Sequence, residues 1–286
     1  MAKTRRTERI VFIMRTLLDH PSAIYPLSAF ADSLGAAKST ISEDLSIIKG
    51  ALERLGIGSL ETFAGAAGGV RYLPRTSSAD IQRIARELAK KLSEPDRVLP
   101  GGFLYMTDIV TDPAWATRIG EIFATKFATS NPDYVVTMET RGIPLALMTS
   151  RAMNLPLVVC RRNAGATDGP SVSINYISGS SRKIETMSLP KRAVRPGASA
   201  LVVDDFMRGG GTAKGIQDLL REFQVDVLGT CVLVATSEPV RKLVDKYYAL
   251  VTLDGVDEAT GKPRVTPVIP EAQEKDPACG IIPAEV

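Results

Sequence analysis

Two adjacent carboxylates, Asp204 and Asp205, follow an apolar stretch that predicts a strand at residues 200–203. Carboxylate oxygens accept hydrogen bonds, so such a pair suits two vicinal sugar hydroxyls. The glycines after it let backbone N–H groups approach a phosphate, and a helix that starts near Ala213 adds a favourable dipole. The pattern indicates a ribose-phosphate site made of Asp204, Asp205, Phe206, Met207, Arg208, Gly209, Gly210, Gly211 and Thr212.

Other interpretations of this stretch stay open on the residues alone. Glycine-rich turns between a strand and a helix are common in α/β folds, and an Asp pair after a strand can also hold Mg²⁺ or cap a loop. The stretch is not a P-loop, because no Lys-Ser/Thr pair follows the glycines. Its glycine spacing also fails to match the GxGxxG pattern of dinucleotide-binding folds.

A second polar loop follows a predicted strand at residues 134–138 and consists of Glu139, Thr140, Arg141 and Gly142. The glycine permits close backbone approach and the arginine supplies a cation, a combination that suits a pyrophosphate. An ordinary connection between a strand and a helix is the alternative. Because both loops follow strands of the same expected sheet, we predict that they form one site.

Residues 161–195 predict a long β-hairpin that includes Tyr176 and whose turn carries the cations Arg182 and Lys183. A mobile basic hairpin can close over phosphates as a lid. A surface hairpin with no role in ligand binding is the alternative.

The pattern of residues 76–286 predicts the elements that position these loops. Apolar, β-branched runs alternate with stretches of helical periodicity, which indicates an α/β fold with a parallel sheet covered by helices. The strands are expected at residues 134–138, 157–160, 200–203, 227–235 and 248–253, and the helices at 79–92, 113–128, 143–154 and 212–223. A further strand is expected at 103–106 and a terminal hairpin at 255–268.

Residues 1–75 predict a separate N-terminal domain. Helices are expected at residues 10–18, at 27–34 and from Lys38 or Ser39 to about residue 55, with a tight turn at Gly35 between the second and third. Strands at 59–64 and 69–73 with a glycine-rich tip resemble a β-wing, so the domain is predicted to be a winged helix-turn-helix. The inward face of the first helix is assigned to Ile10, Ile13, Met14, Leu17 and Leu18.

The net charge of +3 lies entirely in this first domain. Residues 1–75 hold 10 Lys and Arg against 7 Asp and Glu, whereas residues 76–286 hold 25 of each. An excess of cations is the electrostatic signature of nucleic-acid binding, and the start of the third helix would meet the DNA. The predicted DNA contacts are Lys3, Arg5, Arg6, Lys38, Ser39, Thr40, Ser42 and Arg71. A three-helix domain that binds protein or caps a dimer is the alternative.

The remaining composition excludes several classes of protein. The three cysteines, Cys160, Cys231 and Cys279, lie far apart, so neither a zinc site nor a disulfide framework is expected. Their odd number fits a protein of the reducing cytoplasm. The single histidine, His20, precedes Pro21 at a predicted helix end, which argues against chemistry based on Ser-His or metal-His pairs. No apolar run is long enough to span a membrane, and no resident cofactor or metal is expected.

The order of strand, Asp204-Asp205, apolar pair, turn and Gly210-Gly211-Thr212 resembles the motif with which type I phosphoribosyltransferases bind phosphoribosyl pyrophosphate (PRPP). In that family the two acidic residues hold the ribose hydroxyls and the Gly-Gly-Thr loop holds the 5′-phosphate. The resemblance implies the same roles for the matching residues here, with the run from Arg208 to Thr212 at the phosphate. The loop at Glu139 is similar to the pyrophosphate loop of that family.

Residues 206–208, 173–181 and 185–189 resemble a narrower family, the Gram-positive-type purine operon repressors. That family joins a winged-helix head to a phosphoribosyltransferase-like domain, and the resemblance covers essentially the whole chain. It implies a homodimer on operator DNA upstream of purine genes, with PRPP, with or without Mg²⁺, as the inducing ligand. It also implies competition at this pocket from a guanosine tetraphosphate-type alarmone, whose base we place by hypothesis on Phe206 or Tyr176.

A sensor is favoured over an enzyme. In some phosphoribosyltransferases an acidic residue stands where this chain has Arg208, and a guanidinium cannot accept the proton of a base as a carboxylate can. Other members have Ala there. The rival predictions are an active purine phosphoribosyltransferase with a regulatory head and an RNA-binding regulator, against which the helix-turn-helix pattern argues.

Overall fold

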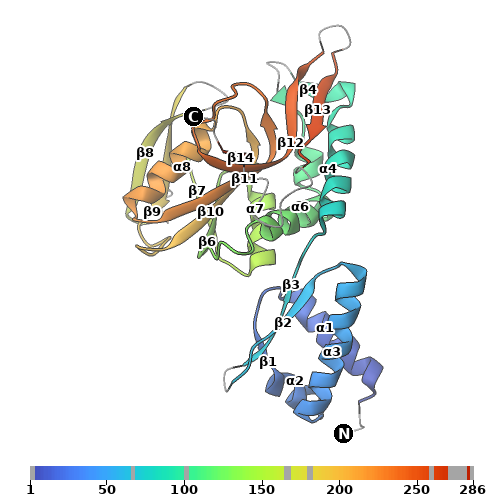
Figure 1. The fold of residues 1–286 in the computed structure, drawn as a ribbon. Coiled ribbons are helices and arrows are strands. Elements are labelled where there is room, and N and C mark those ends of the chain that lie inside the picture. The colour runs from blue at the N-terminus through green and yellow to red at the C-terminus, as the bar shows by residue number, and fades with distance from the viewer. Residues whose placement is uncertain are drawn as a thin grey trace. The chain divides into compact units, whose positions relative to one another are not determined.

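The computed structural model describes residues 4–65, 68–99, 103–163, 169–178, 183–257, 261–269 and 282–283. The chain divides into two compact units, one of residues up to Ser77 together with Arg151–Asn154, and one of Ser78–Ser150 and the residues from Leu155 onward (Figure 1). Each unit buries a hydrophobic core of its own.

The first unit contains three helices and a small antiparallel sheet. The helices are α1 (Arg6–Asp19), α2 (Leu27–Leu34) and α3 (Lys38–Leu55), and the sheet has the order β1 (Tyr25–Pro26), β3 (Gly69–Leu73), β2 (Ser59–Thr62). Gly35 ends α2 with a φ of 58°, in the left-handed region that glycine adopts without a steric penalty. The predicted helix, turn, helix and wing are therefore confirmed, with β2 two residues shorter than expected and β1 not foreseen.

The apolar stripes of the three helices meet in one core. Its fully buried members include Ile13 and Leu17 of α1, Phe30 of α2, and Ile41 and Leu45 of α3. The assignment of Leu18 to this face is wrong, because its side chain is 42% exposed. Adjacent residues on a helix point about 100° apart, so Leu18 turns away from the core where Leu17 faces it.

A buried ion pair joins α1 to α3. Arg9 Nε lies 2.6 Å from Asp44 Oδ2, and the two side chains are 9% and 0% exposed. A second guanidinium nitrogen, Arg9 Nη2, donates to Asp44 Oδ1 at 3.3 Å. The bidentate geometry satisfies both charges inside the domain.

A mostly parallel sheet forms the centre of the second unit. The parallel strands run in the order β12 (Lys246–Val256), β11 (Asp226–Thr236), β10 (Ser199–Met207), β6 (Tyr134–Met138), β7 (Leu157–Cys160). Two antiparallel strands pair with β12, namely β13 (Pro263–Pro267) and β14 (Ile282–Pro283). The predicted α/β class, the parallel sheet and the terminal hairpin are confirmed.

The strand that leads into the acidic pair is longer than predicted. We expected it to end at Val203, but β10 continues to Met207. Its last residues keep the ladder with β11, since Phe206 pairs with Val234 and Met207 with Ala235. Asp204 and Asp205 therefore lie on the strand itself and not in the loop after it.

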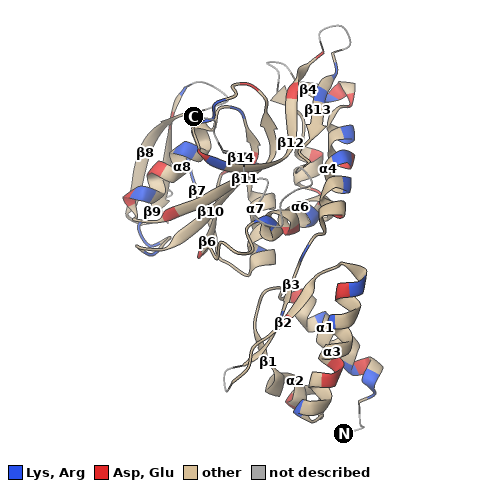
Figure 2. Cartoon of the chain, viewed as in Figure 1, with Lys and Arg blue, Asp and Glu red and all other residues tan. Residues whose placement is uncertain are grey.

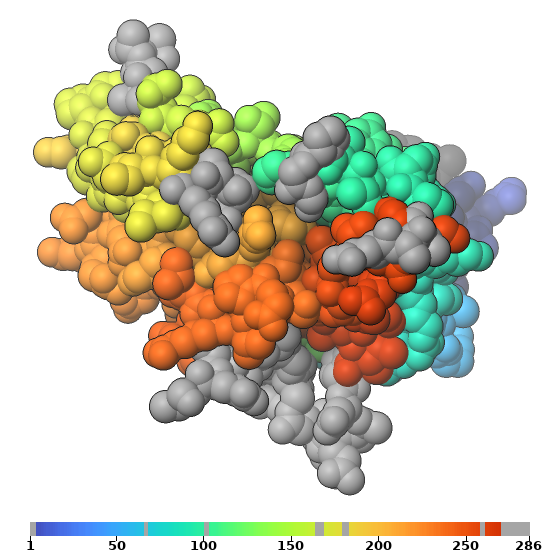
Figure 3. Space-filling model, turned by 90° about the horizontal axis from the view of Figure 1, so that it is seen from above, coloured from blue at the N-terminus to red at the C-terminus, as the bar shows by residue number. Residues whose placement is uncertain are grey.

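One face of the sheet is covered by α8 (Gly211–Glu222) and by the hairpin of β8 (Ser171–Ile177) and β9 (Ile184–Pro190). Their buried side chains, such as Ile216 and Met187, pack with Val136 and Val202 of the sheet. The predicted hairpin is thus confirmed as an element, and part of it is anchored in the core. In the view of Figure 3, the segment near residues 170–190 lies beside the segment that contains α8.

The other helices of the unit are α4 (Ser78–Leu92), α5 (Thr107–Val110), α6 (Pro113–Lys126) and α7 (Ile143–Met153), with a 3₁₀ turn at Pro95–Arg97 and short strands β4 (Val98–Leu99) and β5 (Phe103–Leu104). Phe123 of α6 packs edge-on against Tyr248 of β12, with ring centroids 6.2 Å apart. Helix α4 packs against β12 and β13, and Lys and Arg positions recur along it (Figure 2). Cys160 and Cys231 are buried free thiols. Within the described ranges, no helix is long and apolar enough to cross a membrane.

Candidate functional site

The carboxyl ends of β6 and β10 open into a single cleft. It is lined by the β6–α7 loop, the end of β10 with the glycine turn, the start of α8 and the β8–β9 hairpin, with one residue each from β11 and from the segment after β7. The cavity volume of the cleft is about 120 Å³. The lining residues are Met138, Glu139, Thr140, Arg141, Arg162, Tyr176, Ser178, Glu185, Asp204, Asp205, Phe206, Met207, Arg208, Gly210, Gly211, Thr212, Ala213 and Val232.

The two predicted ligand loops touch each other through Gly142. A Cβ atom added there would lie 2.6 Å from Thr137 Oγ1 and 2.7 Å from Asp204 Oδ1, closer than a real Cβ approaches. Gly142 is therefore required where the β6–α7 loop crosses the acidic pair. The Glu139–Thr140 peptide in the same loop is cis.

The acidic pair carries an electrostatic cost in the ligand-free protein. Burial and the neighbouring Asp205 carboxylate raise the pKa of Asp204 well above its usual range. Its Oδ1 accepts a hydrogen bond from Asp205 N at 2.9 Å. Asp205 is 6% exposed, and its buried Oδ2 has no hydrogen-bond partner within the described part of the chain.

The nearest cation to this pair is Arg141, whose Nε lies 3.5 Å from Asp205 Oδ2 while its side chain is 55% exposed. Two carboxylates with an open oxygen fit donors brought by a ligand, either the hydroxyls of a sugar or a Mg²⁺ ion bound to its phosphates. A bound Mg²⁺ would supply charge neutralisation at that point. The described residues contain no group of three or more His, Cys, Asp and Glu side chains placed to hold a metal ion by themselves.

The glycine turn that follows the acidic pair supplies backbone N–H donors to the cleft. Gly210 has a φ of 81° and is the N-cap of α8, which begins at Gly211. An L side chain there is strained by the backbone and meets Leu243 N at 3.2 Å. Gly210, Gly211 and Thr212 line the cleft at the positive end of the helix dipole, an arrangement that binds anions.

The β8–β9 hairpin lines another side of the cleft, where its side chains form a polar network. Tyr176 Oη donates to Glu185 Oε2 at 3.1 Å, and Arg162 Nε lies 3.8 Å from the same oxygen. Arg162 N also donates to Glu139 Oε1 at 2.7 Å, which connects the hairpin side to the β6–α7 loop. Burial and the hydrogen bond to Glu185 raise the pKa of Tyr176 to about 12, so its hydroxyl stays protonated at neutral pH.

Of the two aromatic residues placed by hypothesis beneath a base, Phe206 is the more accessible. It is half-buried and lines the cleft. Tyr176 is only 8% exposed and packs against α8, where a Cβ on Gly215 would lie 3.0 Å from Tyr176 Cβ. The close approach at Gly215 holds this part of the hairpin against the helix.

Most of the predicted site residues meet in this cleft, and a few do not line it. Gly142 supports the acidic pair from outside the lining, and Gly209 and the exposed Lys183 also lie outside it. Arg182 falls outside the described residues. The sequence reasoning missed Arg162, Ser178 and Glu185 as lining residues; the pair Arg161-Arg162 directly after β7 was the available signal for the first.

The start of α3 presents the polar side chains predicted to contact DNA. Lys38, Ser39 and Ser42 are exposed and Thr40 is half-buried. Arg5 is exposed, and its backbone N donates to Glu8 Oε2 at 2.8 Å. Lys3 lies outside the described residues.

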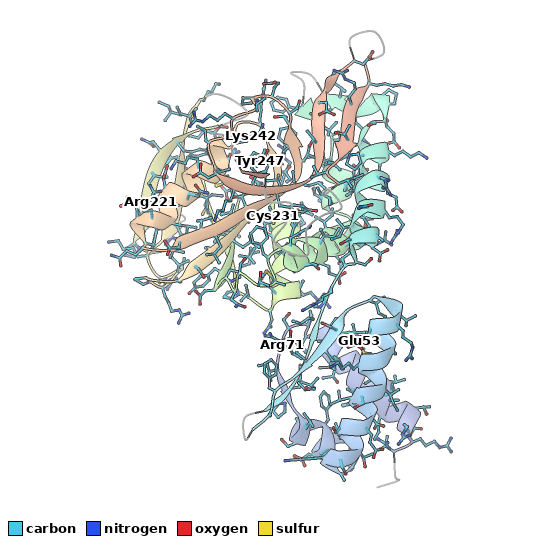
Figure 4. The ribbon with its side chains drawn as sticks, in the orientation of Figure 1. Glu53, Arg71, Arg221, Cys231, Lys242 and Tyr247 are labelled. Carbon is cyan, nitrogen blue, oxygen red and sulfur yellow. The ribbon has the colours of Figure 1, made fainter. Side chains whose placement is uncertain are left out.

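Two other predicted DNA contacts already have acidic partners. Arg6 Nη2 lies 3.0 Å from Glu43 Oε2. Arg71, on the wing (Figure 4), lies 2.7 Å from Glu61 Oε2 and stacks over the Phe63 ring at 5.1 Å. Lys38 at the start of α3 is therefore better placed than Arg71 to meet a phosphate.

Comparisons with known proteins agree with this division. Residues 5–74 match the family model of the N-terminal domain of bacterial purine repressors, and residues 106–265 match that of the phosphoribosyl transferase domain. The purine biosynthesis transcriptional repressor PurR of Bacillus subtilis is 44% identical over 89% of this chain and 90% of its own length. The purine biosynthesis transcriptional activator PurR of Lactococcus lactis subsp. lactis is 37% identical over 89% of this chain and 94% of its own. A xanthine phosphoribosyltransferase of an Exiguobacterium species is 29% identical over 59% of this chain and 90% of its own.

Proposed function

The chain belongs to the bacterial purine repressor family, and from that premise we propose that it represses purine biosynthesis and transport genes until PRPP releases it from DNA. The observation that carries the proposal is the cleft in which the Asp204-Asp205 pair, the glycine turn and the Arg141 loop meet. The same chain carries a head with an exposed polar helix start. The name of the Bacillus relative supports purine genes as the target.

The chemistry of the cleft fits the three parts of PRPP. The ribose hydroxyls would donate to Asp204 and to Asp205, whose Oδ2 has no hydrogen-bond partner among the described residues. The 5′-phosphate would take the backbone donors at Gly210 and Gly211. The pyrophosphate would lie at the loop that carries Arg141, and Mg²⁺ would bridge its oxygens if it accompanies the ligand.

We propose that the domain senses this ligand without consuming it. Arg208 is exposed at the place where some related enzymes carry an acidic residue, and a guanidinium cannot accept the proton of a nucleobase. The active purine phosphoribosyltransferase is the alternative, and the likeness to a xanthine phosphoribosyltransferase is its support. Mixing protein, PRPP and each purine base tests it, since steady release of pyrophosphate would refute the sensor.

A guanosine tetraphosphate-type alarmone is proposed as a competitor for the same cleft. Its pyrophosphate groups would use the two phosphate loops, and its base would stack on the half-buried Phe206. Such a ligand would leave the protein on DNA, whereas PRPP would release it. Two ligands with opposite effects must differ in their affinity for the DNA-bound and released states.

The head is proposed to bind operator DNA as part of a homodimer. A helix-turn-helix protein reads two half-sites about one helical turn apart, which requires two heads. The proposed ligand changes either the spacing of these heads or the exposure of a basic surface. Because the Lactococcus relative is named an activator, a reporter assay in cells is needed to show the direction of regulation.

A gel-shift titration on a purine-gene promoter, with and without PRPP, tests the proposal. We expect a shift that PRPP weakens. The double variant Asp204→Ala/Asp205→Ala should bind the promoter as the wild type does and lose the response to PRPP. The matched control is Asp254→Ala, which removes an acidic side chain bonded to Thr266 that does not line the cleft and should keep the response. No shift, or a shift that PRPP does not change, would refute the proposal.

A further inference from the structure

Two successive carbonyl groups of the glycine turn accept hydrogen bonds from the segment that ends β11 and leads to β12. Arg208 O accepts from Lys242 Nζ at 2.6 Å and lies 3.2 Å from Thr236 Oγ1, whose hydroxyl has a closer acceptor in Glu238 O at 2.6 Å. Gly209 O accepts from Leu243 N at 2.9 Å, whereas Gly210 O accepts from Lys214 N of α8 at 2.8 Å. The end of β11 and the connection to β12 thus form a floor beneath Arg208 and Gly209.

These bonds fix the direction of the backbone donors that follow each carbonyl. In a trans peptide the C=O of one residue and the N–H of the next point in opposite directions. The peptides of this turn are trans, because the cis bonds of the described chain lie elsewhere. The N–H groups of Gly209 and Gly210 are therefore directed away from the floor, and the Gly211 N–H belongs to the first turn of α8. Gly210 and Gly211 line the cleft.

Lys242 is the charged member of the floor, in the connection between β11 and β12 (Figure 4). It is 4% exposed, although lysine is almost never fully buried without partners. Besides Arg208 O, its ammonium donates to Thr236 O at 2.7 Å and Thr236 Oγ1 at 3.3 Å, which satisfies its three N–H groups.

The charge of this lysine lies directly behind the turn. Burial lowers the pKa of Lys242 to about 8, and the nearby Glu238 opposes that shift. The ammonium form therefore predominates at neutral pH. A positive charge behind a set of aligned N–H groups strengthens the field that an anion meets in the cleft.

We propose that Lys242 is a positioning residue for phosphate binding: it holds the Arg208–Gly211 backbone with its N–H groups toward the cleft and adds a buried positive charge behind them. The inference rests on the proposed function, which places the 5′-phosphate of the ligand at this turn. Lys242 does not touch the ligand itself. Its effect is confined to the end of the cleft that the turn forms.

Binding of two partial ligands to the full-length chain tests the inference. Ribose 5-phosphate should use the glycine turn and the acidic pair, whereas inorganic pyrophosphate should use the loop that carries Arg141. In Lys242→Met, which keeps most of the length of the side chain and removes its donors, we expect affinity for ribose 5-phosphate to fall tenfold or more. Affinity for pyrophosphate should stay within twofold of the wild type, as measured by isothermal titration calorimetry.

A purely structural role predicts a different outcome. It would lower the affinity for both probes together, or for neither, and either result would overturn the positioning role. Wild-type protein that binds neither probe would overturn the proposed function and this inference with it. The melting temperature of each variant, measured without ligand, separates loss of folding from loss of binding.

Two further variants complete the test. Lys126→Met changes a half-buried lysine outside the cleft lining, which packs over the Tyr248 ring at 5.1 Å, and should leave both affinities unchanged. Thr236→Val removes the hydroxyl between Lys242 and Arg208 O while Lys242 keeps its backbone acceptors. It should reduce the affinity for ribose 5-phosphate by a smaller factor, and it carries the test if Lys242→Met fails to fold.

Discussion

Each unit of the chain buries charged side chains, but in opposite arrangements. In the head, Asp44 is fully buried against Arg9, with a bidentate ion pair between them. In the second unit, Asp204 and Asp205 are adjacent carboxylates, and Asp205 Oδ2 has no hydrogen-bond partner among the described residues. One site is complete within the protein, whereas the other has an unmet requirement for donors.

The difference separates a structural charge from a ligand-binding one. A paired buried charge holds two elements in register, and removal of one partner leaves the other charge uncompensated. A like-charged pair lowers the stability of the ligand-free protein and gains stability only when donors or cations arrive. Stability measurements can therefore distinguish the two sites without any assay of function.

Removal of Asp44 has the largest expected effect on stability. Asp44→Ala leaves Arg9 buried without its partner and should destabilise the head by about 3–5 kcal/mol. Denaturation followed by circular dichroism should then show the head unfolding before the second unit. The control is Glu43→Ala, which removes an exposed partner of Arg6 and should cost less than about 1 kcal/mol. Equal losses for the two variants would contradict the structural role of the pair.

Neutralisation of Asp204 has a smaller effect of the opposite sign. Asp204→Asn keeps an oxygen for Asp205 N and removes the repulsion, so the ligand-free protein should gain about 1–2 kcal/mol at pH 7. Because the folded-state pKa of Asp204 is raised, the wild type loses stability as the pH rises through that pKa. The advantage of the variant should therefore shrink as the pH falls toward the ordinary value of 3.8. An advantage that does not depend on pH would show that repulsion is not its source.

Lys38→Ala tests whether the start of α3 contacts DNA and whether that contact is independent of the cleft. Loss of one phosphate contact should weaken promoter binding by about 1 kcal/mol and reduce the slope of log K against log salt by about 0.9. The affinity for PRPP should not change. Lys49→Ala, which removes an exposed lysine further along α3, is the control and should leave the salt slope unchanged. A loss of PRPP affinity in Lys38→Ala would contradict the separation of the two sites.

Arg71→Ala is expected to have the smallest effect. Its guanidinium is already engaged by Glu61 and the Phe63 ring, so a contact with DNA has to compete with both. We expect a loss of promoter affinity below about 0.5 kcal/mol, within the range of an exposed ion pair. Fluorescence anisotropy on the same promoter would detect the reverse order, in which the wing contributes more than the start of α3.

Local patterns in the sequence predict most of the elements correctly. Helix α2 and strand β7 have the predicted bounds, and α3 begins at one of its two predicted starts, because Gly35 and the apolar stripe of α3 are strong local signals. The end of β10 was wrong because pairing with β11 extends the strand through Met207. That partner lies on another segment, so no local pattern reports it.

The site residues also divide into those that a local pattern predicts and those that only the fold brings to the site. Asp204, Asp205 and the glycine turn form a contiguous motif, and the sequence predicts them together. Lys242, Arg162 and Glu185 reach the site only through the fold, from the β11–β12 connection and from either side of the hairpin. The buried partner of Arg9 was missed for the same reason, since Asp44 lies on a different helix.

The absence of a side chain at Gly142 has a practical consequence for chemical probes of this protein. Because the β6–α7 loop rests directly on Asp204, a fragment that displaces that loop also disturbs the acidic pair, which leads into the glycine turn at the other end of the cleft. Two fragments, one built for each end, would therefore compete or cooperate through the protein even where they never touch. An inhibitor assembled by linking them would have an affinity that the separate halves do not predict.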